Sequence, residues 1–185
     1  MDPVAPWLAS GRRVIVNPTS GEHIVIRTSG AETGGRELVF DLFLPPGTHV
    51  PATHVHPVQT EQFAVVAGRM RFTMAGRTIL AGPGETVVVP PRTVHWFGNA
   101  GSEVAHAVVK VRPALRMEEL LEASEAMGPP KRILGLKLTP ATAFAAFMLE
   151  FRREIAVPHV PAFLVNALLA PLARLARRRA ARSAA

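Results

Sequence analysis

Apolar and polar residues alternate in many short runs over the first 112 residues of the chain. Such runs, or short stretches of β-branched residues, occur at residues 13–17, 23–28, 37–44, 62–67, 69–74, 77–80, 86–89, 95–97 and 104–111. Turn-forming clusters separate them, for example at residues 17–21 and 82–84. Side chains that alternate with period two point to opposite faces of a strand, and turn signals between short strands are typical of sandwiches and barrels. The pattern predicts an all-β fold of nine short strands.

The hydrophobic period becomes helical after Pro113. A first helix is indicated by residues that share one face, namely Met117, Leu120, Leu121 and Ser124. A Gly-Pro-Pro sequence at 128–130 then breaks the pattern. Thr139 is the predicted N-cap of a second helix, with Pro140 at its first position. The apolar stripe of this second helix comprises Phe144, Phe147, Met148, Phe151 and Ile155.

A third helical segment spans residues 161–180, and Pro171 is expected to kink or divide it. Its apolar side contains Leu164, Leu168, Leu172 and Leu175. We therefore predict a β-barrel domain over residues 1–112 and a helical extension over residues 113–185. The helices are expected to pack on the outside of the barrel or across the seam of a homodimer.

The chain contains no cysteine, which excludes disulfides and thiolate chemistry and fits a cytoplasmic location. Its first residues begin acidic and lack the sustained apolar core of a signal peptide. No stretch reaches the roughly 20 apolar residues that span a bilayer.

The net charge of +7 is concentrated at the C-terminus. Residues 171–185 contain five arginines and no acid, which leaves 16 basic against 14 acidic groups in the first 170 residues. A nearly neutral body excludes a basic face for specific nucleic acid recognition. The apolar side of residues 160–185 runs into this basic cluster, so weak contact with an anionic membrane surface is a second interpretation of this segment. The first is ordinary helix packing with a basic helix end.

Two segments hold histidines and a glutamate at the spacing of metal ligands. Residues 47–68 contain His54, His56 and Glu61, and residues 84–99 contain His95. Alternate residues on a strand share a face, so His54 and His56 can reach one point. Three imidazoles and a carboxylate suit a divalent transition metal with open coordination positions, whether Fe, Mn, Ni, Cu or Zn.

The two segments resemble the paired motifs of the cupin superfamily. The first reads Gly, spacer, His-x-His, four residues, Glu, six residues, Gly, and the second reads Gly, five residues, Pro-x-x, two residues, His, three residues, Asn. The spacer after Gly47 is one residue longer than usual, and Arg92 replaces the usual glycine of the second motif. Arginine tolerates positive φ poorly, so the turn before His95 is expected to differ in shape. The resemblance implies a double-stranded β-helix, the cupin jelly roll.

The resemblance also favours the metal interpretation for these four residues over a hydrogen-bonded core cluster. Burying such a cluster without a cation is costly. The remaining histidines that we considered are predicted to be ordinary hydrogen-bonded core residues: His23, His49, His106 and His159.

The resemblance implies three classes of function. The first is a metal-dependent oxidoreductase of the dioxygenase type, as in the quercetinase-like branch, with Glu61 as both ligand and catalytic residue. The second is a metal-dependent isomerase or lyase. The third is a non-catalytic cupin that binds a small molecule or acts as an auxiliary protein, with or without membrane contact.

Strand parity predicts the lining of a substrate pocket. If Glu61 faces inward, Phe63 and Val65 do so as well, and Phe97 lies on the same side as His95. Gln59, close to the ligands in the sequence, is a further candidate for binding a substrate oxygen. These residues predict an apolar pocket for a small oxygen-bearing compound.

Overall fold

The computed structural model describes residues 7, 13–126, 131–133, 136–138, 141–160 and 162–183. Its β-strands are β1 (Val14–Val16), β2 (His23–Thr28), β3 (Leu38–Leu44), β4 (Thr60–Ala67), β5 (Met70–Met74), β6 (Arg77–Ala81), β7 (Thr86–Val89), β8 (His95–Asn99), β9 (Ala105–Arg112), β10 (Lys131–Ile133) and β11 (Leu136–Leu138). Its helices are α2 (Met117–Ala126), α3 (Ala141–Glu150) and α4 (Ala162–Ser183).

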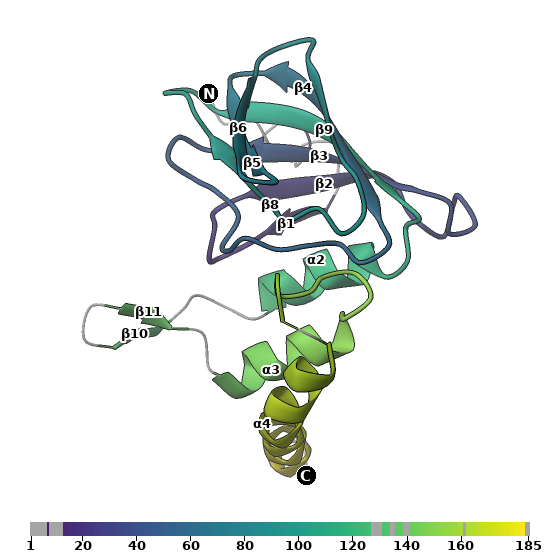
Figure 1. The fold of residues 1–185 in the computed structure, drawn as a ribbon, viewed down its shortest axis with the longest axis vertical. Helices are drawn as coiled ribbons and strands as arrows, with labels where there is room; N and C mark the ends of the chain where they lie inside the picture. The colour runs from purple at the N-terminus through teal and green to yellow at the C-terminus, as the bar shows by residue number, and fades with distance from the viewer. Residues whose placement is uncertain are drawn as a thin grey trace.

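The first nine strands form two antiparallel sheets that face each other (Figure 1). The larger sheet has the order β1-β2-β3-β9-β4-β7, and the smaller has the order β6-β5-β8. Phe63 of β4 meets Phe72 of β5 and Phe97 of β8 between the sheets, with ring centroids 5.1 and 4.8 Å apart. The all-β prediction is confirmed, and every predicted run lies on a strand because each presents one apolar face to this shared core.

The helices lie together below the barrel in Figure 1. The four residues predicted to share one face of the first helix are the buried residues of α2. Pro171 lies inside α4, which continues through it, so the prediction that this proline divides the segment is wrong. A proline removes one backbone hydrogen bond, and α4 is packed against α3, which supports it. The predicted cap at Thr139 and Pro140 lies outside the described residues.

Two further features differ from the sequence prediction. A short antiparallel hairpin, β10 with β11, stands between α2 and α3, where only a break was expected. In the turn before His95, Arg92 adopts the left-handed backbone conformation, with a φ of 61°. The backbone N–H of Arg92 donates to the carbonyl of His56 at 2.8 Å. That hydrogen bond holds an arginine where glycine would be less strained, at a conformational cost of about 1 kcal/mol. Arg92 thus adopts a left-handed conformation that glycine tolerates more easily.

Candidate metal centre and cavity

The four predicted ligands come from three separate parts of the barrel. His54 and His56 lie on the extended segment before β4, Glu61 lies on β4, and His95 opens β8. His54 and His95 face each other as an antiparallel pair, and each backbone N–H donates to the other's carbonyl at 3.0 Å. Since alternate residues share a side, His56 points the same way as His54, while Val55 pairs with Ala156. The fold therefore brings both motifs to one point.

The side chains of these residues form a tight and mostly buried cluster. One candidate ligand atom from each of the four lies within 4.8 Å of the others. Glu61 Oε2 lies 3.2 Å from His56 Nε2 and 3.1 Å from His95 Nε2. His56, Glu61 and His95 are buried, and His54 is partly buried.

Backbone carbonyls determine which imidazole nitrogen faces the cluster. Nδ1 of His54 donates to the carbonyl of Ala52 and Nδ1 of His95 to that of Thr93, both at 3.0 Å. Nδ1 of His56 donates to the carbonyl of Glu154 at 2.5 Å. A carbonyl oxygen only accepts, so Nδ1 carries a proton in each ring and Nε2 is the nitrogen available to a cation. In this structure Nε2 of His95 is hydrogen-bonded to Glu61 Oε2 at 3.1 Å.

The cluster fits a metal ion on the evidence of its own unsatisfied atoms. Nε2 of His56 is buried and has no hydrogen-bond partner among the described residues. It instead faces Glu61 Oε2, so two acceptor atoms are 3.2 Å apart. Such a contact is favourable only with a positive charge between or on the two groups, either a proton or a metal ion.

The electrostatics of the cluster also favour a cation. Although burial acts the other way, the neighbouring imidazoles of His56 and His95 hold the pKa of Glu61 far below its usual range. Burial also opposes the charged form of His56, but the Glu61 carboxylate raises its pKa. Burial, with His95 and His56 beside it, lowers the pKa of His54 to about 4. Glu61 is therefore an anion near neutral pH and His54 is neutral, which are the forms that bind metal.

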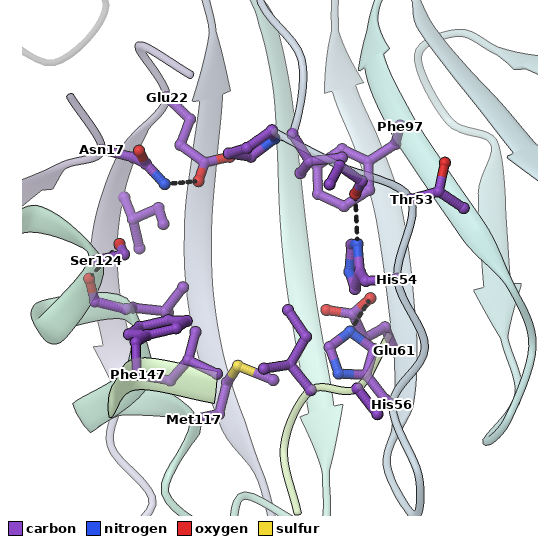
Figure 2. Close-up of a pocket in the computed structure, with 18 of the residues that line it drawn as sticks. Asn17, Glu22, Thr53, His54, His56, Glu61, Phe97, Met117, Ser124 and Phe147 are labelled. Atoms are coloured by element: carbon purple, nitrogen blue, oxygen red, sulfur yellow. Dashed lines mark hydrogen bonds and ion pairs between the residues drawn. The ribbon is translucent and has the colours of Figure 1, made fainter. Parts of the chain in front are cut away.

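Three residues of the cluster, His54, His56 and Glu61, form one wall of a cavity of about 210 Å³. Figure 2 shows Asn17, Glu22 and Ser124 across the cavity from His54, His56 and Glu61. The surface between them is apolar, and its larger residues are Ile24, Phe40, Leu42, Phe63, Phe97, Met117, Leu120, Leu121, Phe144, Phe147, Met148 and Ile155.

Two of the four predicted pocket residues, Phe63 and Phe97, line this cavity. Val65 is buried in the barrel core and is not part of the lining. Gln59 also lies away from the cavity, and its prediction as a substrate contact is corrected. It is fully buried, and its Nε2 donates to the carbonyls of Pro113 and Ala114 at 3.0 Å each. Gln59 thereby ties the barrel to the segment that leads into α2.

The remaining histidines have mixed environments. His106 lies 2.6 Å from Asp41 and stacks on Phe43, and His49 bonds the carbonyl of Val50 at 2.8 Å. His23 is partly buried. His159 is exposed, so its prediction as a core residue is wrong. It lies in the turn after α3, where no strand or helix covers it.

The C-terminal extension contributes to the site, which sequence reasoning missed. Residues of α2, α3 and 155–157 line the cavity. Ala156 exchanges two backbone hydrogen bonds with Val55, at 2.9 and 3.2 Å. The extension thus packs over one end of the barrel interior and not only on its outside. The apolar faces of α2 and α3 signalled burial, but nothing in them showed which surface they cover. Asn17 and Glu22 belong to a turn, and no motif or periodic pattern in the sequence marked them as residues of a site.

Comparison with known proteins agrees with this architecture. Residues 41–111 match the cupin domain family. The barrel is therefore similar to the cupin domain family over these residues. The germin-like protein subfamily T member 3 of Arabidopsis thaliana is 28% identical over 134 residues, which cover 60% of this chain and 57% of the plant protein. This chain therefore spans less than two thirds of that relative's length.

Several solved structures align with the barrel region at low sequence identity. A predicted oxalate decarboxylase of Thermotoga maritima aligns at 19% identity with a TM-score of 0.48, over 55% of this chain and 91% of that one. A Klebsiella pneumoniae protein with a double-stranded beta-helix domain aligns at 23% identity with a TM-score of 0.46, over 55% of this chain and 85% of that one.

Proposed function

We propose that this protein is a metal-dependent enzyme of the dioxygenase type that acts on a small, apolar, oxygen-bearing compound. One observation carries the proposal: the imidazoles of three histidines and one carboxylate converge, and His54, His56 and Glu61 among them line an apolar cavity. His54, His56, Glu61 and His95 would hold a divalent transition metal. When bound, the metal supplies Lewis acidity and, for Fe, Mn, Ni or Cu, redox chemistry.

The chain's own residues bind the substrate and handle its proton. Phe63 and Phe97 form apolar walls that favour a flat, apolar body and exclude water. Glu61 reaches the cavity as an anion and can accept a proton from a substrate hydroxyl. The three Nδ1 hydrogen bonds keep the imidazoles in fixed orientations, so the site is organised before substrate enters.

Metal analysis of the full chain, purified without chelators, tests the metal site. We expect one transition metal ion per chain in the wild type and at least a tenfold loss of affinity in His56→Ala. His159→Ala is the matched control, because His159 is exposed and outside the cluster. Substoichiometric metal in the wild type, or metal content that His56→Ala leaves unchanged, would remove the proposal.

The reaction type is tested by incubating the metal-loaded protein with a panel of single-ring catechols and other small enol-forming compounds. We expect dioxygen consumption, followed with an oxygen electrode, together with product formation in the same sample. Product without dioxygen consumption supports an isomerase or lyase instead. Binding with no conversion supports the second candidate, a non-catalytic binding cupin, which the enclosure of the cavity by α2 and α3 favours.

A further inference from the structure

The cavity has a second polar end, opposite the metal cluster. Glu22 lies there directly before β2, with Asn17 and Ser124 beside it (Figure 2). The carboxyl of Glu22 lines the cavity, yet only 6% of the residue is exposed. Among the described residues, no lysine, arginine or histidine forms an ion pair with it. A buried carboxyl without a cationic partner costs free energy, so its position in a cavity indicates a role in binding.

The turn between β1 and β2 aims this carboxyl at the cavity. Asn17 Nδ2 donates to Glu22 Oε1 at 3.1 Å. Asn17 Oδ1 accepts the backbone N–H of Thr19 at 3.0 Å, and the backbone N–H of Asn17 donates to the carbonyl of Glu22 at 3.0 Å. The amide of Asn17 is therefore occupied by the turn and by Glu22. It orients the carboxyl and has little capacity left for a ligand.

Glu22 is also the strongest candidate donor at this end of the cavity. The hydroxyl of Ser124 already donates to the carbonyl of Leu121 at 2.6 Å, so its proton is used within α2. Burial raises the pKa of Glu22 to about 7, and the negative charge of Glu61 acts in the same direction. A large share of the Glu22 side chains is thus a neutral acid at and below neutral pH, with one O–H to donate.

The volume between the two polar ends bounds the size of the ligand. An engineered apolar cavity of about 150 Å³ in another protein binds benzene. The cavity here, at about 210 Å³, accommodates one ring with small substituents. Its apolar middle suits the ring, and its two polar ends suit an oxygen function on each side.

We propose that Glu22 determines ligand specificity by donating a hydrogen bond to an oxygen at the end of the ligand remote from the metal. The ligand class is a single-ring compound with metal-binding oxygens at one end and a carbonyl or hydroxyl at the other. This inference rests on the proposed function for the metal-binding end only.

Paired probes test the role of Glu22 on the full chain loaded with Co²⁺. One probe is 3,4-dihydroxybenzaldehyde, whose carbonyl lies opposite the catechol, and the other is 4-methylcatechol, which lacks it. A second pair, 3,4-dihydroxycinnamaldehyde and 4-propenylcatechol, tests a longer span. Calorimetry at pH 6 gives the ratio of the two dissociation constants within each pair. Comparing this ratio between proteins cancels the different intrinsic metal affinities of the two catechols.

We expect Glu22→Leu to reduce the relative affinity for the carbonyl probe about fivefold to tenfold in at least one pair. Glu22→Gln should keep most of the preference, because its amide also donates. Cobalt stoichiometry, read separately by metal analysis, should stay equal in all three proteins. Equal ratios in wild type and Glu22→Leu, or no probe binding by the cobalt-loaded wild type, would overturn the inference while leaving the metal site intact. Absence of cobalt binding would overturn the proposed function and this inference together.

Discussion

The three histidines of the cluster are oriented in two different ways. His54 and His95 each donate through Nδ1 to the carbonyl two residues earlier, at Ala52 and Thr93. These contacts are local and depend only on an extended backbone. His56 instead donates to Glu154, which is 98 positions away. The orientation of one predicted ligand therefore depends on the helical extension, and no motif spacing could reveal that dependence.

Glu22 should make the stability of the metal-free protein depend on pH. Its pKa in the folded protein, about 7, lies above the ordinary 4.5, so between these values the native state keeps a proton that the unfolded chain has lost. Native stability contributed by this group is therefore lost as pH rises from about 4.5 to 7. Glu22→Gln cannot ionise, and its stability relative to wild type should increase by about 1 to 3 kcal/mol between pH 5 and pH 8.

Urea unfolding in the presence of a chelator, at several pH values, measures this difference. The groups that face Glu22 are the amide of Asn17, the hydroxyl of Ser20 and, across the cavity, Glu61, His54 and His56. These groups are present in both proteins, so their own titration largely cancels in the comparison. A stability difference that stays constant from pH 5 to pH 8 would contradict the prediction.

At the scale of elements, the segment after α3 acts as an added strand beside the ligand-bearing segment. Ala156 pairs with Val55, which places the Glu154 carbonyl against His56. Glu154 is itself anchored, since its Oε1 accepts the backbone N–H of Arg116 at the start of α2. The segment after α3, α2 and the candidate metal cluster are thus joined by one backbone pair and two hydrogen bonds between a side chain and the backbone.

Removing one of these bonds should weaken metal binding without unfolding the barrel. Ala156→Pro lacks the N–H that donates to the Val55 carbonyl at 2.9 Å. We expect about a tenfold loss in metal affinity, the scale seen when a partner of a metal-bound histidine is removed. Ala156→Ser keeps the N–H and serves as the control at the same position. Competition with a metal chelator measures the affinity, and equal values for both variants and wild type would show that this pairing does not support the site.

At the scale of the whole molecule, α4 extends away from the barrel in Figure 1. It exposes large apolar side chains, with Phe163 and Leu168 each 69% exposed. Its C-terminal half carries five arginines and no acid. In the described part of the chain, no helix has the length and apolar character needed to cross a bilayer. Apolar side chains next to clustered arginines suit a helix that lies on an anionic membrane surface.

Sedimentation with vesicles of phosphatidylserine and phosphatidylcholine tests this surface. The double variant Phe163→Ser, Leu168→Ser should lower the bound fraction several-fold, and added salt should lower it in the wild type. Leu80→Ser is the control, because Leu80 is 53% exposed on β6 of the barrel. Wild type and double variant that sediment equally would argue against membrane contact.

Local patterns in the sequence were sufficient for the nine barrel strands, for the buried face of α2 and for the choice of candidate ligands. The run of alternating residues at 104–111 corresponds to β9, and the predicted apolar face of α2 is its buried face. The four residues at metal-ligand spacing, His54, His56, Glu61 and His95, lie together in one cluster. Alternation and helical period are properties of neighbouring residues, so they can be read without knowing the fold.

Only the tertiary structure decided what lies beside those residues. In the structure, Gln59 is hydrogen-bonded to the segment that leads into α2, and Glu22 lies across the cavity from the candidate metal ligands. The carbonyl of Glu154 accepts a hydrogen bond from His56. Each of these positions depends on contacts between segments far apart in the chain. Such contacts produce no periodic pattern of residues that could be recognised in the sequence. The residues of the candidate metal cluster were predictable because their spacing is local, whereas the cavity beside them depends on the packing of the whole chain.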